Sequence, residues 1–256
     1  MKCKKKSTLI NLILIIMLIM CLILSTLLII VSISKEKIVK KNGSEISNSY
    51  SNEEDANNTW DVSANGDNTV IASLIEDGTL TISGIGEMKS WNYDATTDWH
   101  ENKEQVKKVI IQDGVTSIGK EAFYGCVNLE IVEISNTVIT IGDGAFCACS
   151  KLLTLDIPEG TITIGNNAFA SCTSLKDIKI ANTIKNIGSS AFGGCTSLTS
   201  VEIPSNITII EYNVFVGCTN LTNIKLPNGL TTIKDTAFMS CSNLTTIEIP
   251  STITSI

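Results

Sequence analysis

The apolar positions in the C-terminal part of the chain recur at a fixed interval of 23 residues. Three residue types keep a constant phase in this interval: Phe123, Phe146, Phe169, Phe192, Phe215 and Phe238; Cys126, Cys149, Cys172, Cys195, Cys218 and Cys241; Leu129, Leu152, Leu175, Leu198, Leu221 and Leu244. A period between 20 and 50 residues is typical of solenoids, in which each short unit buries the apolar face of its neighbour. We therefore expect residues 107–256 to form a solenoid of about six units, truncated at the C-terminus.

Each unit ends in a short alternating pattern that predicts a β-strand. In the first unit the apolar positions are Leu129, Val132 and Ile134, and equivalent triplets follow in the later units. Stacked copies of such a strand form a parallel sheet with a spacing of about 4.8 Å. Proline follows the strand in four units, where it removes a donor from the ladder, at Pro158, Pro204, Pro227 and Pro250. The expected fold is therefore mainly β, with short parallel strands.

Residues 57–106 lack the 23-residue period. Alternating runs around 70–74 and 79–82, interrupted by glycines, predict short strands. Solenoids need an atypical end unit to cover the first repeat, and Trp60, Trp91 and Trp99 offer the apolar bulk for it. We expect a small β-rich N-terminal cap.

The N-terminus has the pattern of an export or anchoring signal. Lysines precede a nearly unbroken apolar run over residues 9–33, which is long enough to span a bilayer as a helix. Residues 1–34 are therefore predicted to be an uncleaved signal anchor with a transmembrane helix, which places the repeats outside the cell membrane. The small residues Ser32 and Ser34 leave open a signal peptide cleaved after Ser34, and hence secretion. Residues 35–56 are rich in Lys, Asn, Ser and Glu and predict a flexible linker.

The charge of the chain argues against one class of partner. The first 41 residues hold eight of the 19 lysines and one of the 26 acidic residues. The rest of the chain therefore holds 11 lysines and 25 acidic residues, which gives it a formal net charge of −14. The chain contains no arginine. Without basic patches or the bidentate donors that grip phosphate, nucleic acid is not an expected partner. Membrane contact is expected only through residues 9–33.

No catalytic, cofactor or metal site is predicted. The only histidine, His100, lies outside the array in a charged stretch, and no nucleophile, phosphate-binding or paired-carboxylate motif is present. Asp61 opens a calcium-like loop, but its twelfth position is Ala72 instead of a bidentate glutamate. The six periodic cysteines are expected to be buried free thiols. Cys147, spaced CxC with Cys149, is the best candidate for a reactive thiol.

The units themselves carry a family resemblance. CTSLTSVEIP (195–204), GVTSIG (114–119) and AFYGC (122–126) resemble BspA-type leucine-rich repeats of microbial cell surfaces, over residues 107–256. The resemblance implies a curved, right-handed solenoid, surface display, and binding of host or neighbouring-cell proteins, as in adhesion. The chain departs from the pattern in single residues only: Val214 for Ala, Glu211 and Lys234 for Gly, Thr161 for an apolar residue, and Gln112, Ser135 and Ala181 for Pro. These departures put local regularity in question, not the fold.

In leucine-rich arrays, the residues between the buried strand positions face the concave side, which gives a candidate binding face. It consists of a charged column, Glu133, Asp156, Lys179, Glu202, Lys225 and Glu248, and a small polar column, Thr154, Asp177, Ser200, Asn223 and Thr246. From Asp156 onward the charges alternate in sign, so the charged column either aligns the repeats or contacts a ligand. The polar column suits hydrogen bonds to a protein, or to a glycan. Ile131 and Leu153 are the only adjacent exposed apolar pair expected there.

Two functions follow from this sequence. The first is a non-enzymatic, surface-displayed module that binds protein, as an adhesin does. The alternative is a structural spacer or stalk that presents a C-terminal domain missing from this chain. A binding module predicts saturable binding through the candidate face, whereas a spacer predicts none.

Overall fold

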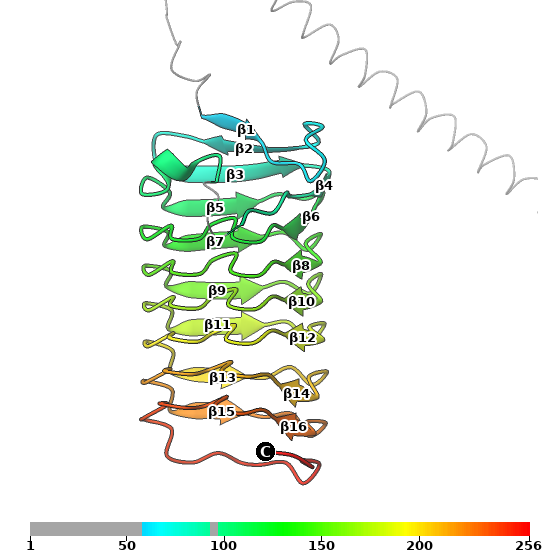
Figure 1. Cartoon of the computed structure of the whole chain (residues 1–256), viewed down its shortest axis with the longest axis vertical. Helices are drawn as coiled ribbons and strands as arrows, with labels where there is room; N and C mark the ends of the chain where they lie inside the picture. Colours follow the sequence, from blue (N-terminus) through cyan, green and yellow to red (C-terminus); the bar gives the residue numbers. More distant parts are fainter. Residues whose placement is uncertain (1–57, 93–96) are drawn as a thin grey trace, which may run out of the picture. The chain divides into compact units, whose positions relative to one another are not determined.

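The computed structural model describes residues 58–92 and 97–256 (Figure 1). The signal anchor and the linker predicted for residues 1–34 and 35–56 lie outside the described residues. Within the described ranges, no helix has the length and apolar character needed to cross a membrane.

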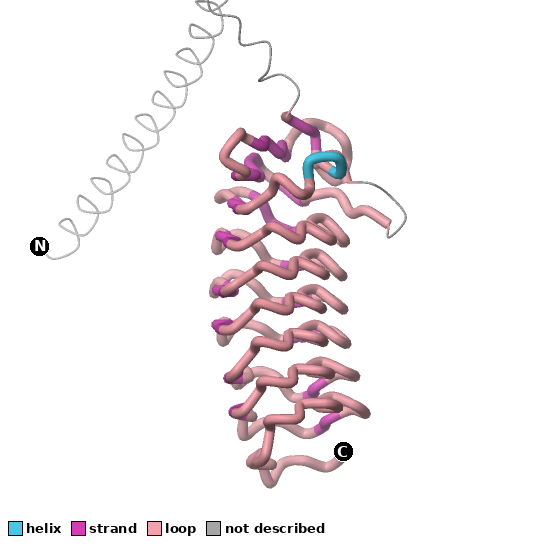
Figure 2. The backbone as a smooth tube through the Cα atoms, turned by 90° about the vertical axis from the view of Figure 1, so that its left-hand side faces the viewer, coloured by secondary structure: helices cyan, strands magenta, loops and turns pink. Residues whose placement is uncertain are grey.

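From residue 108 onward the chain winds into stacked repeats with a strand on each of two faces and irregular backbone on a third (Figures 1 and 2). The first face carries β5 (Lys108–Ile111), β7 (Ile131–Ile134), β9 (Thr154–Ile157), β11 (Asp177–Ile180), β13 (Ser200–Glu202) and β15 (Asn223–Lys225). The second face carries β6 (Val115–Ile118), β8 (Thr140–Ile141), β10 (Thr163–Ile164), β12 (Asn186–Ile187), β14 (Ile209–Ile210) and β16 (Thr232–Ile233). Paired strands are parallel and offset by one repeat, so that Leu155 of β9 lies opposite Ile178 of β11. The predicted solenoid with short parallel strands is confirmed.

Before the first repeat, the chain forms four strands, the last of which is only two residues long. These are β1 (Thr59–Asp61), β2 (Val70–Leu74), β3 (Thr79–Gly84) and β4 (Gly86–Glu87), followed by a 3-10 helix at His100–Asn102. β1, β2 and β3 pair antiparallel, and β3 then pairs parallel with β5. β2 and β3 lie where the sequence predicts strands. The role of this segment as a cap stays a prediction.

The core is a continuous column of aromatic rings and thiols between the faces. Phe123, Phe146, Phe169, Phe192 and Phe215 have no exposed surface, and successive rings stack with centroids 4.9–5.8 Å apart through to Phe238. Trp99 extends this column, because its ring stacks on Phe123 at 5.5 Å. Each thiol from Cys149 to Cys241 donates to the carbonyl of the phenylalanine 26 residues earlier, at 3.1–3.3 Å. The expected placement of the Phe and Cys columns in a dry interior is confirmed.

The turn glycines lie where successive repeats come close together. At Gly165, an added Cβ would lie 2.5 Å from the backbone nitrogen of Asp143 in the preceding repeat, and at Gly188 it would lie 2.5 Å from that of Asn166. Contacts this short do not occur between real atoms, so glycine fits these two turns without a shift of the backbone. Glycine is not required at every boundary, because Lys234 occupies the same repeat position and its amide still donates to Ile210 at 2.9 Å.

The sheet on the first face is not continuous, contrary to the single stack that the strand pattern predicts. Ladder pairs join β5 to β7, β9 to β11 and β13 to β15, but not β7 to β9 or β11 to β13. Pro158 and Pro204 follow β9 and β13, the two strands that lack a ladder to the strand before them, whereas the equivalent Ser135 after β7 donates its amide to Ile111 at 3.1 Å. Because proline has no N–H, the ladder loses a donor at the strand end. Pro227 follows β15 without the same effect, and there an ion pair crosses the two strands at 2.6 Å.

Candidate binding face

The structure places every candidate residue on the exposed side of the first face. Glu133 lies on β7, Thr154 and Asp156 on β9, Asp177 and Lys179 on β11, Ser200 and Glu202 on β13, and Asn223 and Lys225 on β15. Thr246 and Glu248 lie in the segment that follows the β16 repeat, which forms no strand. All eleven side chains are exposed, because they alternate with the buried strand positions. We call this set the candidate binding face.

The charged column is largely occupied by ion pairs within the protein. Lys179 pairs with Asp156 at 3.3 Å and Lys225 with Glu202 at 2.6 Å, each along the column. Glu133 pairs instead with Lys108 of β5, at 2.6 Å. Each of these pairs spans two strands that are also joined by a backbone ladder. The charged column therefore links neighbouring repeats.

The polar column differs, because its side chains are not engaged. Within the described part of the chain, the side chains of Thr154, Asp177, Ser200, Asn223 and Thr246 make no hydrogen bond and no ion pair to other protein groups. Their donors and acceptors face solvent in a row at the spacing of the repeats. A row of unengaged hydroxyl, amide and carboxylate groups can bond a polar partner without breaking any contact inside the protein.

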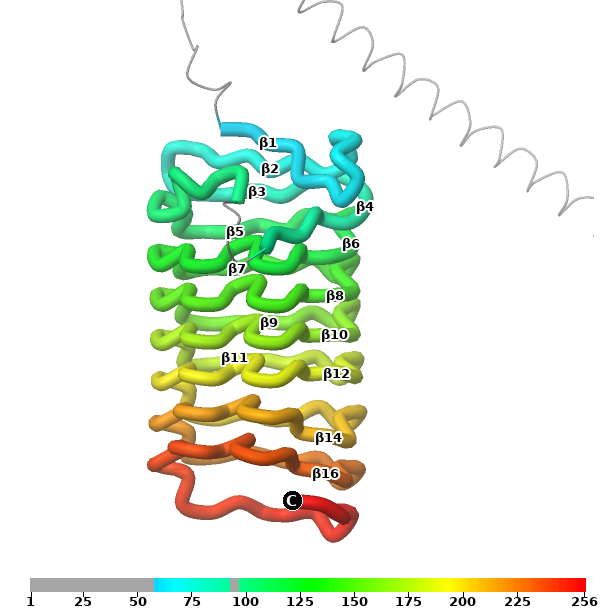
Figure 3. The backbone as a smooth tube through the Cα atoms, in the orientation of Figure 1, coloured from blue at the N-terminus to red at the C-terminus, as the bar shows by residue number. Residues whose placement is uncertain are grey.

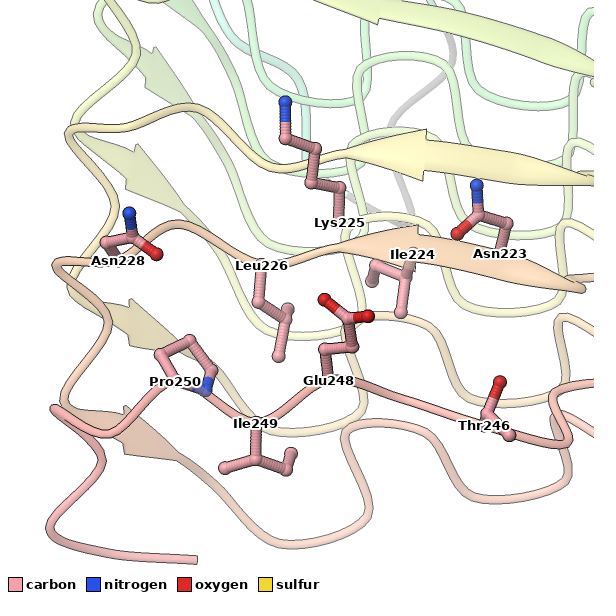
Figure 4. Close-up of a pocket in the computed structure, with 9 residues that line it drawn as sticks. All are labelled: Asn223, Ile224, Lys225, Leu226, Asn228, Thr246, Glu248, Ile249 and Pro250. Carbon is pink, nitrogen blue, oxygen red and sulfur yellow. The ribbon is translucent and has the colours of Figure 1, made fainter.

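One part of the candidate binding face is hollowed. A cavity of about 400 Å³ lies between β15 and residues 246–250 (Figure 4). Its wall contains Asn223, Lys225, Thr246 and Glu248, and Ile224, Leu226, Ile249, Asn228 and Pro250 complete its lining. Since 246–250 forms no ladder with β15, the two segments leave room for polar side chains around an apolar floor. The hollow brings four predicted residues together.

Exposed apolar side chains are few on this face. Ile131 is 49% exposed and Leu153 is 46% exposed, as predicted for this pair. They belong to neighbouring repeats at the interrupted boundary between β7 and β9.

The thiols of the array differ in burial. All seven cysteines of the described residues are free, and six of them are buried. Burial raises the pKa of Cys126, Cys172 and Cys218 to about 12. Cys147 is half-buried, and burial together with the nearby Glu121 carboxylate raises its pKa above the ordinary value. A raised pKa disfavours the thiolate, which argues against Cys147 as the reactive thiol that the sequence suggests.

The other candidate residues lie apart. His100 is exposed on the short 3-10 helix. Asp61 accepts hydrogen bonds from the amide and hydroxyl of Ser63, and the bond from that hydroxyl is the main cause of its lowered pKa. In residues 58–92 and 97–256, no three His, Cys, Asp or Glu side chains gather closely enough to hold a metal ion.

The repeats of this chain match those of known proteins. Residues 97–219 and 162–256 match the model of the BspA type leucine-rich repeat region, in 6 copies. A leucine-rich repeat protein of T. pallidum is similar, with 28% identity, 70% of this chain and 89% of that chain covered, and a TM-score of 0.56. A leucine-rich repeat protein of Bacteroides ovatus, at 24% identity, shares the fold over 72% of this chain and 58% of that chain, with a TM-score of 0.50. No curated protein matches the chain. With the family model covering more than half of its length, this chain belongs to the BspA-type leucine-rich repeat family.

Proposed function

We propose that this protein is a surface-displayed, non-enzymatic binding module of the adhesion type that holds a protein partner on its candidate binding face. The observation that carries this proposal is the polar column, in which five side chains in successive repeats are exposed and unengaged within the described residues. The charged column is already paired within the protein, so it contributes less to a partner. A glycan is a second ligand for the same row of hydroxyl and amide groups.

Display at the surface rests on the N-terminal sequence and on the family. The apolar run over residues 9–33 would hold the chain in the cell membrane, with 35–56 as a linker and the repeats outside. Cleavage after Ser34 would release the same module. The antiparallel strands β1, β2 and β3 would then close the N-terminal end of the array.

A binding experiment tests the function directly. The full chain in mild detergent is immobilised and probed with a panel of purified extracellular-matrix and cell-surface proteins, and with a glycan array. We expect saturable binding to at least one protein probe. Asp177→Lys and Ser200→Lys should weaken that binding at least about tenfold, because each places a long cation in the polar column. Asn186→Lys is the matched control on the second face and should leave the affinity unchanged.

The alternative function, a structural spacer, is favoured by one observation. Within the charged column, Lys179 pairs with Asp156 and Lys225 pairs with Glu202. Because these opposite charges offset each other, the column presents little net electrostatic field to steer a partner. A spacer predicts no saturable binding to any probe. Binding that the Asn186→Lys and Asp177→Lys variants reduce equally would also speak against the candidate binding face.

A further inference from the structure

One boundary in the array is interrupted on both strand faces. The repeat with β11 and β12 covers residues 176–198, and the next repeat, with β13 and β14, covers residues 199–221. No ladder joins β11 to β13, and no ladder joins β12 to β14. The five-stranded sheet of the second face ends at β12, and β14 starts a new sheet with β16. We call the boundary between residues 198 and 199 the seam. Figure 3 shows successive coils drawn further apart at the seam than above it.

The seam lacks two backbone hydrogen bonds that neighbouring boundaries have. At the closed boundaries, the equivalent amides donate at 2.8–2.9 Å: Ile162 to Ile139, Lys185 to Ile162, Thr231 to Thr208, Gly165 to Ile141, Gly188 to Ile164, and Lys234 to Ile210. Among the described residues, the amides of Thr208 and Glu211 make no such bond to Lys185 and Ile187. On the first face, the remaining amide bond from Thr199 to Lys176 is 3.5 Å long, against 2.9 Å for Thr222 to Thr199 at the next boundary.

The seam coincides with a change of residue type at position 211. The preceding repeats carry glycine at this position, and an added Cβ at Gly188 would lie 2.5 Å from the backbone of the repeat before it. Glu211 has that Cβ, so a preceding backbone placed as it is at Gly188 would clash with it. Lys234 also has a Cβ, yet its amide donates to Ile210 at 2.9 Å and the ladder forms again. A Cβ at this position therefore does not keep a boundary open by itself, and the seam falls where glycine first changes to a residue with a side chain.

One side chain crosses the seam between the two strand faces, where the Asn206 amide donates to the Asn182 carbonyl at 2.6 Å. A hollow of about 350 Å³ runs along the second face from Asp143 past the closed boundary between β10 and β12, and it reaches across the seam to Thr208, Ile209 and Glu211. The side chain of Glu211 is turned to the next repeat, where it accepts from Lys234 at 2.8 Å. It does not bridge the seam.

The third face stays closed at the same boundary. The amides of Ser190, Phe192 and Gly194 donate to Tyr212, Val214 and Val216 at 2.9, 3.0 and 2.7 Å. The rings of Phe192 and Phe215 stack with centroids 5.7 Å apart. Two faces without ladders and one with a complete set of bonds have the arrangement of a hinge.

We propose that the seam is a hinge: residues 199–256 open and close against residues 58–198 by rotation about the third face, and this opening precedes unfolding of either block. Local opening has a low free energy where few backbone bonds must break. In a repeat array, where each repeat contacts only its neighbours, one weak boundary separates two cooperative blocks. The seam also passes between Lys179 and Glu202, so the opening changes the spacing of the candidate binding face. The hinge itself does not depend on that face binding a partner.

Hydrogen–deuterium exchange of the full chain in mild detergent, with fragmentation that resolves single amides, tests the hinge. After correction for intrinsic rates, we expect the amides of Thr208 and Glu211 to exchange at least about tenfold faster than those of Thr231 and Lys234. The amides of Phe192 and Gly194, on the third face, should remain as protected as those of Phe169 and Ser171. Equal protection of Thr208 and Thr231 would overturn the proposal.

A pair of variants tests the cause. Glu211→Gly removes the Cβ and should slow exchange at positions 208 and 211 at least about tenfold, because the two missing bonds can form. Lys234→Gly makes the same change at a closed boundary and should leave both rates within about threefold of the wild type. If Glu211→Gly leaves the rates unchanged, the side chain is not the cause and the proposal fails in this form. If that variant does not fold, the wild-type comparison of Thr208 with Thr231 decides the matter alone.

Discussion

The rings of Phe146 and Phe169 lie parallel, with 5.3 Å between their centroids and 3° between their planes. They occupy the same position in successive repeats, and neither has exposed surface. Each interior ring therefore packs against a copy of itself on both sides, so a change at one repeat is felt by two neighbours. We therefore expect this column to be a main source of the stability of the array.

Removal of an interior ring should be costly. Phe169→Ala is expected to lower the free energy of unfolding by about 3–5 kcal/mol, because a large cavity opens between two repeats. Urea unfolding followed by far-UV circular dichroism measures the loss. Phe238→Ala is the matched control, since within the described residues that ring is only partly buried and stacks on Phe215 alone, at 5.8 Å. Its cost should be clearly smaller; equal costs would show that the column is not the main source of stability.

Thiol labelling should distinguish Cys147 from the buried column. Because the thiolate is the nucleophile and Cys147 is half-buried, iodoacetamide should modify it at least about tenfold faster than Cys172 in the native protein. Burial and Glu121 raise the pKa of Cys147, so its labelling rate should be low at pH 8 and rise about tenfold per pH unit through pH 9. Mass spectrometry of the peptides measures both rates. Rapid labelling of Cys172 without denaturant would contradict the buried column.

Glu121 should make stability depend on pH. Burial is the main cause of its raised pKa, the Asp143 carboxylate raises it further, Lys120 opposes, and its Oε2 atom is buried with no hydrogen-bond partner among the described residues. A carboxyl group with a folded pKa above its unfolded pKa destabilises the fold at pH values above both, and this penalty disappears at pH values below both.

We therefore expect Glu121→Gln to be more stable than the wild type at pH 7, by less than about 1 kcal/mol, because the side chain is only partly buried. The difference should vanish below about pH 4, where the wild-type carboxyl group is protonated in both states. Thermal or urea unfolding of both proteins across this range measures it. Glu159→Gln, at an exposed position, is the control and should show no such trend. A gain that persists at low pH would assign the effect to packing instead of charge.

The periodic residues predicted most of the fold. Phe146, Cys149 and Leu152 recur in phase because each repeat buries the same positions, so a sequence with this period has one dry interior. The extension of the column to Trp99 was not predicted, because that residue lies 24 positions before Phe123 instead of 23. The sequence signal for this extension was an aromatic residue only one position away from the 23-residue spacing.

Local pairing was less predictable. Pro204 coincides with a lost ladder and Pro227 with a kept one, so the missing donor alone does not decide the outcome. The replacement of glycine by Glu211 was visible as a departure from the repeat. The lost ladder was not visible, because the close approach of the preceding backbone to this position appears only in the stacked structure, and Lys234 at the same position keeps its ladder.

The sequence predicted which side chains of the candidate binding face are exposed, but not which of them form ion pairs or hydrogen bonds. Alternation along each strand predicts which side chains point outward, and all of the chosen side chains do. The pattern could not show that Glu133 pairs with Lys108 of the preceding strand, outside the column, or that Asp177 is left unengaged. Side-chain partners depend on length and rotamer, which strand periodicity does not determine.

The ion pairs of the charged column should contribute little energy individually. In Lys225–Glu202 the two side chains are 73% and 70% exposed, so a double-mutant cycle with Lys225→Met and Glu202→Gln should give a coupling below about 1 kcal/mol. The coupling should fall further in 1 M salt, because exposed charges are screened. Lys179–Asp156, at 3.3 Å and equally exposed, should give a similar or smaller value. A coupling well above 1 kcal/mol that salt does not reduce would mean that the column holds neighbouring repeats together. A small, salt-sensitive coupling would leave that role to the aromatic column and the backbone ladders.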